Sequence, residues 1–321
     1  MFVLHLSFDA GPMEAIQGGP DLDFTDLSIE ELVDLEVTSV SRKPQKASHA
    51  AAAIFVITAE DIYRLGITTI PEALRMVPGL QVCRITSSAY AVSSRGFSSR
   101  YANKLLIQID GRTIYTPTFS GVFWEIQDMF IDDIDRIEVI RGPGASLWGA
   151  NAVNGIINII SKNAEDSQGG IVYGGEGYKD ISHYGIRYGG KIGNKGYYKF
   201  YTKFSDYDET EGRGNEKTFD SQKRIQAGAQ ADMNLANGTV IQTHMNIFSS
   251  DTGEHSVFPS MTPPDYTEEL RLKNDDYGGN FLVKGTYTLS PSSDLTVQVY
   301  YDRFKIELIR SQCHKVKNIS L

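Results

Sequence analysis

The stretch RIEVIRGPGASLWGANAVNGIINIISK, residues 136–162, decides the fold expected for this chain. A β-branched run at 137–140 predicts one strand, and a second run at 156–160 predicts another. The glycines between the runs allow backbone conformations that other residues rarely adopt. No Gly-Lys-Ser/Thr sequence follows, so this is not a phosphate-binding loop. A βα-type turn of a soluble enzyme has similar features, and this stretch alone leaves that alternative open.

The motifs around this stretch resemble the plug domain of TonB-dependent outer-membrane receptors. That family carries an arginine-glycine-proline turn, a small-residue segment and an asparagine-glycine-isoleucine strand, which correspond here to 141–143, 147–152 and 154–159. Two further family motifs match upstream, at Arg95-Gly96-Phe97 and at 109–112 (Ile-Asp-Gly-Arg). Each motif alone is weak, but together and in the right order these motifs are a specific signal.

The resemblance implies an α+β plug domain followed by antiparallel transmembrane β-barrel strands. It divides the chain into an N-terminal arm with a TonB box (1–46), the plug (47–165) and the first portion of the barrel (166–321). The resemblance rests on specific motifs over residues 35–165, and elsewhere only on the alternation of apolar and polar residues. The barrel is expected to be incomplete, with about seven strands, because plugged transporters close with about 22. We therefore expect the amino-terminal part of a receptor.

The same resemblance implies a receptor that actively imports a scarce nutrient across the outer membrane of a Gram-negative-type bacterium. The implied partners are the TonB–ExbB–ExbD energy-transducing complex, outer-membrane lipid and a nutrient ligand such as a metal chelate. Ferric siderophore is the commonest ligand of the family, with cobalamin or an oligosaccharide as alternatives. A soluble β-rich ligand-binding protein, or an outer-membrane adhesin without transport, remains the rival interpretation.

The TonB box is expected in the N-terminal arm, which would lie in the periplasm. Its residues would be Leu35, Glu36, Val37, Thr38, Ser39 and Val40, a β-favouring run in a polar context. An extended peptide of this kind can add to a sheet edge through main-chain hydrogen bonds, which dictate few side chains. A strand of the plug, or a linker, would have the same appearance.

Two short helices are expected inside the plug. Thr58 with Asp61, and Thr69 with Glu72, have the spacing of capping boxes. Three carboxylates at 132, 133 and 135 resemble an acid/base group. We interpret them as a solvated surface, because no nucleophile or histidine lies nearby in the sequence.

Charged plug residues are expected to contact a polar lumen wall. The candidates are Arg95, Arg112, Arg136, Glu138 and Arg141. Wet contacts of this kind contribute about 0–1 kcal/mol each, so they would hold the plug and still let it be removed.

A loop rich in aromatic residues is expected to face outward and to contact ligand. Its candidate residues are Tyr115, Phe119, Phe123 and Trp124.

From residue 169 onward, apolar and polar residues alternate in segments separated by turns, as in barrel strands. The predicted strands are 169–175, 182–193, 196–206, 221–235, 238–250, 276–290 and 294–309. Long polar loops are expected at 206–220 and 251–275. Soluble antiparallel sheets alternate as well, so the membrane assignment rests on the plug motifs.

Composition excludes several other classes of function. The formal charge of −9 argues against a protein that binds nucleic acid by neutralising phosphates. The six histidines are scattered, and Cys83 and Cys313 are far apart, so we expect no metal site and no cofactor. No Gly-x-Ser-x-Gly elbow is present, and we expect no catalytic residues and no enzyme activity.

Overall fold

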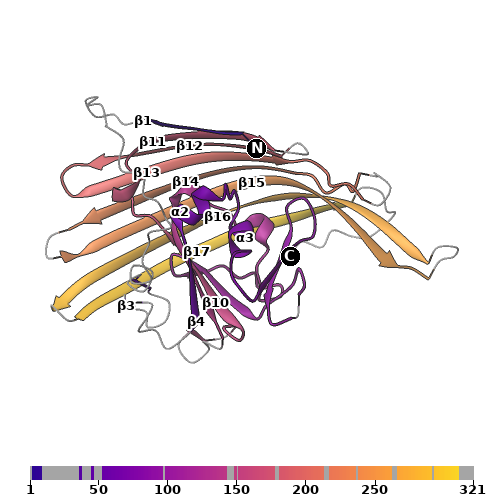
Figure 1. Ribbon diagram of the computed structural model, residues 1–321, viewed down its shortest axis with the longest axis horizontal. Helices are drawn as coiled ribbons and strands as arrows, with labels where there is room; N and C mark the ends of the chain where they lie inside the picture. The colour runs from indigo at the N-terminus through magenta and orange to yellow at the C-terminus, as the bar shows by residue number, and fades with distance from the viewer. Residues whose placement is uncertain are drawn as a thin grey trace.

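The computed structural model has a small α/β unit, the plug, set against a long curved sheet of strands (Figure 1). The structure describes residues 2–8, 36–37, 45–46, 53–96, 98–142, 148–149, 151–177, 181–212, 217–235, 238–261, 266–290 and 293–310. None of the helices in these ranges is long and apolar enough to cross a membrane.

The plug is built on a five-stranded sheet. Its strands, in spatial order, are β4 (Ala53–Thr58), β9 (Ile134–Arg141), β10 (Gly155–Ser161), β7 (Leu105–Ile109) and β8 (Arg112–Thr113). The two β-branched runs of the opening stretch are β9 and β10, which pair antiparallel with Ile140 opposite Ile156. The predicted strand, turn and strand are therefore confirmed. β10 then pairs parallel with β7 and completes a buried central layer.

Two short helices, α2 (Ala59–Arg64) and α3 (Ile70–Leu74), lie beside the plug sheet. Thr58 caps α2 in a full capping box with Asp61, as predicted. Thr69 occupies the N-cap of α3 but makes no side-chain cap hydrogen bond, so the second predicted box is wrong. The reason is visible in Glu72, which instead accepts a hydrogen bond from the Tyr90 hydroxyl of β6 (Tyr90–Ser94).

The core of the plug is apolar. Strand β6 pairs with β5 (Leu80–Arg84) and borders it. The fully buried side chains include Ile57, Leu74, Ile137, Ile157 and Ile159, contributed by both the helices and the sheet. Burying such side chains contributes about 1.5–3 kcal/mol each, and this is the main source of the stability of the plug.

Seven consecutive strands follow the plug, as predicted. They are β11 (Gly169–Gly177), β12 (Ile181–Ile192), β13 (Gly196–Tyr207), β14 (Gln222–Asn234), β15 (Val240–Pro259), β16 (Thr267–Ser290) and β17 (Ser293–Arg310). Each pairs antiparallel with the next. The predicted polar loop at 251–275 is wrong, because β15 and β16 continue through most of it as one long hairpin. At the opposite edge, β1 (Phe2–Phe8) pairs with β11.

The strand sheet distributes its side chains in the opposite way to a water-soluble protein. On β13, Lys199 and Lys203 are buried against the plug while Phe200 and Phe204 are exposed. Across the sheet, the exposed face carries aliphatic and aromatic residues such as Ile247. A polar interior and an apolar exterior are the arrangement of membrane barrels.

Tyrosine rings lie over glycines of the neighbouring strand at several paired positions. Tyr173 faces Gly185 and Tyr201 faces Gly228. A Cβ atom on Gly185 would lie 2.5 Å from the Tyr173 ring, and one on Gly228 would lie 2.4 Å from Tyr201. Each ring can lie on the backbone of the neighbouring strand only because glycine has no side chain there. These ring-on-glycine pairs therefore fix the register of the strands.

Candidate functional site

One irregular segment of the plug, residues 125–133, lies along the inner face of β12, β13 and β14; we call it the anchor strip. Its backbone carbonyl oxygens at 125, 126, 128 and 129 accept hydrogen bonds from buried side chains of the sheet. The donors are Lys203, Gln222, Arg224 and Gln226, at 2.8–3.3 Å. Apart from two short 3₁₀ turns the segment has no regular secondary structure, and much of its backbone is satisfied by the wall that it contacts.

Two carboxylates of the anchor strip form buried ion pairs with the sheet. Asp133 lies 3.0 Å from Arg187 Nη1 and 3.4 Å from Lys199 Nζ, and Asp128 lies 2.7 Å from Lys203 Nζ. The Asp133 side chain is 4% exposed. Its interpretation as part of a solvated surface is therefore wrong: the 3₁₀ turn Ile131–Asp133 directs it onto the lumen wall.

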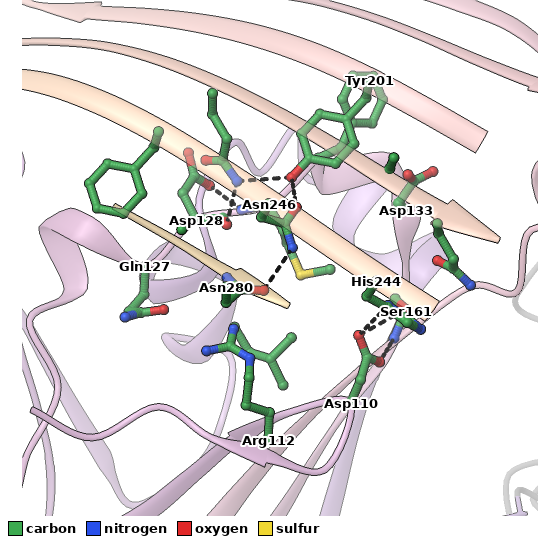
Figure 2. Close-up of a pocket in the computed structure, with 18 of the residues that line it drawn as sticks. Asp110, Arg112, Gln127, Asp128, Asp133, Ser161, Tyr201, His244, Asn246 and Asn280 are labelled. Atoms are coloured by element: carbon green, nitrogen blue, oxygen red, sulfur yellow. Dashed lines mark hydrogen bonds and ion pairs between the residues drawn. The ribbon is translucent and has the colours of Figure 1, made fainter. Parts of the chain in front are cut away.

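A second set of contacts joins the plug to β15 and β17. Arg112, one of the predicted wall-contacting residues, forms an ion pair with Asp302 of β17. Its neighbour Asp110 lies 3.4 Å from His244 Nδ1 (Figure 2), and the Asp110 carbonyl oxygen accepts a hydrogen bond from Gln298 at 3.3 Å. Arg112 is thus the predicted residue that the structure places against the wall.

The other predicted wall-contacting residues have contacts within the plug. Arg136 pairs with Glu138 at 2.9 Å, and Arg141 donates to the Pro78 carbonyl oxygen at 3.3 Å. Arg95 is exposed in a turn with a positive φ of 59°. Arg136, Glu138 and Arg141 lie on β9, whose two edges pair with the plug strands β4 and β10, and the Glu138 side chain is fully buried.

The predicted ligand-contacting loop divides into buried and exposed residues. Trp124 is 5% exposed and belongs to the plug core, which corrects the expectation that it contacts ligand. Tyr115 packs against the same core, and burial raises its pKa to about 12. Phe119 and Phe123 are partly exposed; they lie edge to face with each other at 4.9 Å between ring centroids, and with Tyr101 at 5.2 and 6.4 Å. We call Tyr101, Phe119 and Phe123 the aromatic cluster.

Arg100 connects the aromatic cluster to the strand sheet. Its guanidinium lies 2.6 Å from Glu125 of the anchor strip, 2.7 Å from Glu254 of β15, and over the Phe123 ring at 5.9 Å. Burial alone would lower the Arg100 pKa, but the two carboxylates raise it well above its usual value. Sequence reasoning missed this residue; the signal was an arginine directly beside Tyr101, at the edge of an aromatic loop.

A further contact joins the plug to the loop between β13 and β14, at the end of the sheet where the aromatic cluster lies. The Asp220 carboxylate accepts hydrogen bonds from the Ser87 backbone N–H at 2.8 Å and from Thr210 and Thr218 at 2.7 Å. Burial would raise the Asp220 pKa, but these hydrogen bonds outweigh it and the pKa is lowered. The link fixes a surface loop against the plug.

A cavity of about 70 Å³ lies between the plug and the inner face of β13–β17 (Figure 2). A row of hydrogen bonds crosses its wall. Gln226 donates to the Tyr201 hydroxyl, Tyr201 donates to Asn246, and Asn246 donates to Asn280, over 2.6–3.2 Å. Within the described residues, no group of three or more His, Cys, Asp or Glu side chains could hold a metal ion. The lining suits binding through hydrogen bonds.

The predicted TonB box is described at two residues. Glu36–Val37 form β2, which pairs antiparallel with β3 (Gln45–Lys46). Leu35 and the segment 38–40 lie outside the described residues. The box therefore stays a prediction.

Comparison with known proteins agrees with this geometry. Residues 46–156 match the family model of the TonB-dependent receptor plug domain. Over 162 residues the chain is 35% identical to the vitamin B12 transporter BtuB of Vibrio cholerae serotype O1, covering 50% of this chain and 26% of that protein. BtuB of Photobacterium profundum is 31% identical over 179 residues, covering 54% and 28%. The chain spans about a quarter of the length of these curated relatives.

Solved receptor structures share the fold. The ferric-catecholate import receptor Fiu of E. coli K12 superposes with a TM-score of 0.67 at 15% identity, covering 86% of this chain and 40% of Fiu. The siderophore receptor PiuA of Acinetobacter baumannii gives 0.63 at 20% identity, covering 88% and 40%. Residues 46–156 are thus a plug domain of the TonB-dependent receptor family, followed by seven antiparallel strands arranged as in the barrels of these receptors.

Proposed function

We propose that this chain is the plug and first barrel portion of an outer-membrane receptor that imports a scarce nutrient by TonB-dependent active transport. The observation that carries the proposal is the plug held by polar contacts inside a sheet whose outer face is apolar. Such a plug closes the lumen, yet its contacts can be broken without unfolding a shared apolar core. A water-soluble ligand-binding protein would bury apolar residues at this interface instead.

The ligand site of this receptor is the aromatic cluster with Arg100. Tyr101 is 55% exposed, and the three rings form an apolar surface on the plug beside the long β15–β16 hairpin. Aromatic rings pack against the flat or apolar surfaces of a ligand with little loss of side-chain entropy. The Arg100 guanidinium lies over the Phe123 ring and forms ion pairs with Glu125 and Glu254, which neutralise the charge of the guanidinium.

The ligand class that we propose is a metal chelate. Ferric siderophore is the commonest choice of the family, and PiuA and Fiu are named as siderophore and ferric-catecholate receptors. Cobalamin is the second candidate, and the observation that favours it is the 35% identity to BtuB of V. cholerae, a vitamin B12 transporter. Both ligands enclose a metal in an organic shell that aromatic side chains can contact.

The test is uptake by cells that lack other receptors and express the receptor containing this chain. Radiolabelled cobalamin and ferric siderophores are offered with and without dissipation of the proton-motive force. We expect energy-dependent accumulation of one class, and we expect Phe119→Ala with Phe123→Ala to weaken binding about tenfold or more. The matched control is Tyr301→Ala, an exposed aromatic side chain on β17. No accumulation of any ligand would overturn the proposal.

The energy-transducing partner is proposed to capture residues 35–40. Val37→Pro removes a main-chain donor that strand addition needs, so uptake should be lost while ligand binding persists. Loss of both together would indicate misfolding instead. Heat-modifiable migration and dependence on detergent would separate the receptor from a soluble protein.

A further inference from the structure

A buried carboxylate joins the loop between β13 and β14 to the plug. Asp220 is 3% exposed, and four donors surround its carboxylate at 2.7–2.8 Å. They are the backbone N–H groups of Ser87 and Thr210 and the hydroxyls of Thr210 and Thr218. A buried charge is costly unless hydrogen bonds replace its hydration, so the carboxylate depends on each donor. We call Asp220 and its three partners the clasp.

Three of the four donors belong to the loop itself. Thr210 and Thr218 face each other across its neck, where the Thr218 N–H also donates to the Thr210 carbonyl oxygen at 3.1 Å. An isolated β-bridge closes the loop beyond them. The loop is therefore folded as a unit around Asp220. The fourth donor, Ser87, lies 133 positions earlier in the plug and fixes where this unit sits.

The plug contributes the tip of the β5–β6 hairpin, residues 85–89, which we call the plug tip. Ser87 is fully buried, and its hydroxyl donates to the main-chain carbonyl oxygen of Asp220, so two hydrogen bonds connect these residues. Arg84, at the base of the tip, donates to the Ser87 carbonyl oxygen at 2.9 Å and lies over the Tyr207 ring at 5.7 Å. The plug tip thus contacts both ends of the loop, at the end of β13 and at Asp220.

The other side of the loop rests on β15, beside the proposed ligand site. The Gly253 N–H donates to the Ser221 carbonyl oxygen at 2.8 Å. A Cβ atom on Gly253 would lie only 2.6 Å from the Phe219 carbonyl oxygen, so the loop backbone lies directly on this strand. The next residue, Glu254, forms the ion pair with Arg100. A displacement of the loop therefore disturbs the strand that positions Arg100.

We propose that Asp220 is a positioning residue through which the plug tip sets the affinity of the ligand site. The clasp makes the plug tip and the 208–220 loop one rigid unit, and this unit holds β15 where Glu254 pairs with Arg100. Ligand affinity is then high only while the clasp is closed. The inference rests on the proposed function for the ligand itself. It goes further by assigning control of affinity to residues outside the aromatic cluster.

The coupling between the clasp and the ligand site must act in both directions. If opening the clasp weakens ligand binding by some factor, bound ligand must oppose opening of the clasp by the same factor. A purely structural role for Asp220 predicts a less stable loop, but no response of the loop to ligand. The response of the loop to ligand is therefore the observation that separates the two roles.

Trypsin cleavage after Lys217 measures opening of the clasp in the detergent-solubilised full receptor. The Lys217 side chain is 69% exposed, but cleavage requires the surrounding backbone to open. We expect Asp220→Asn to raise the rate of this cleavage about tenfold or more. It should also weaken binding of cobalamin or a ferric siderophore, each titrated in turn, about fivefold or more. In the wild-type receptor, saturation with the bound ligand should slow the cleavage about fivefold or more.

Asp206→Asn is the matched control, because Asp206 lies at the same end of β13 and pairs with the exposed Lys223. It should leave cleavage and binding within about twofold of the wild type. Ser87→Pro tests the plug's side of the clasp, since proline has no N–H to donate. It should raise cleavage in a loop 133 positions away while the tryptophan fluorescence of the plug stays that of the wild type. If this variant misfolds, Asp220→Asn and the protection by ligand decide the matter.

The outcomes separate the inference from the proposed function. Cleavage of the Asp220→Asn variant at the wild-type rate would overturn the clasp. Raised cleavage with unchanged affinity, and no protection by ligand, would leave Asp220 a structural residue and overturn the control of affinity. A wild-type receptor that binds neither ligand contradicts the proposed ligand site instead, and the cleavage rates alone then show whether the clasp exists.

Discussion

The plug and the strand sheet bury opposite kinds of side chain. In the plug, Ile137 and Ile157 are fully buried and charged residues lie mainly at its surface. In the sheet, Lys203 and Arg224 are buried while Ile247 is exposed. The plug is therefore built for water outside it, and the sheet for lipid outside it. The interface between them is mainly polar, with Phe130 of the plug packed on Tyr173 and Tyr201 of the sheet as an aromatic contact within it.

The largest loss of stability is expected when one partner of a buried ion pair at this interface is removed. Asp133→Asn leaves Arg187 and Lys199 buried without a carboxylate, and removing one partner of a buried ion pair costs about 3–5 kcal/mol. Both tryptophans, Trp124 and Trp148, lie in the plug, so fluorescence during urea unfolding follows that unit. We expect an earlier unfolding transition.

Asp135→Asn is the matched control for Asp133→Asn. The Asp135 side chain is 44% exposed and pairs with Arg136 inside the plug. Its loss should cost under about 1 kcal/mol. Equal effects of the two substitutions would remove the distinction between the anchor strip and an ordinary surface pair.

The two burial patterns can be compared directly with one substitution in each region. Ile157→Ala creates a cavity in the plug core and should lower the free energy of unfolding by about 2–5 kcal/mol. Ile247→Ala, on the exposed face of β15, should cost under about 1 kcal/mol in detergent, since it leaves no internal void. Denaturant titrations of both variants measure this difference, and a reversed order would contradict the assignment of inside and outside.

Alkaline pH should weaken the plug through Tyr90. Burial, assisted by the hydrogen bond to Glu72, raises its pKa from 10.0 to about 12. The folded state therefore keeps the phenol proton that the unfolded state loses. The stabilisation is complete below pH 10 and is lost as pH rises toward 12, by about 2 kcal/mol. Tyr90→Phe should flatten this part of the stability–pH curve, and an unchanged slope would exclude Tyr90 as its source.

The smallest effect concerns the helix caps. Thr58→Ala removes the capping box of α2 and should cost about 1 kcal/mol. Thr69 has the same N-cap position on α3 without a side-chain cap bond, so Thr69→Ala should cost clearly less. Thermal unfolding of the two variants compares a formed cap with an unformed one. A larger loss of stability from Thr69→Ala than from Thr58→Ala would show that the N-cap hydrogen bond does not determine which substitution costs more.

The strands could be predicted because each carries a local pattern. The β-branched runs gave β9 and β10, and period-two alternation gave β11–β14 within a few residues. The long hairpin at 251–275 could not be found in this way. It extends past the sheet's main body, where neither face needs to be apolar, so its polar sequence resembles a loop.

The site was harder to predict because its contacts are not local. Arg112 was placed against the wall correctly, but its partner Asp302 lies 190 positions away. Asp133 was misread because a carboxylate beside other carboxylates gives no sign of the two cations on β12 and β13. One usable signal was present: Lys199 and Lys203 fall on the inward face of an alternating strand, and an inward lysine requires an acidic partner.

The rings that lie over glycines have a consequence for how the sheet is assembled. Tyr173 pairs with Gly185 and Tyr201 with Gly228, so the β11–β12 and β13–β14 hairpins each have a ring-on-glycine contact that fixes their register. A slip of one residue would drive a ring into a side chain and also exchange the lipid-facing and lumen-facing sets. The alignment of these two hairpins is therefore set by contacts within each hairpin and does not need a strand that is distant in the sequence.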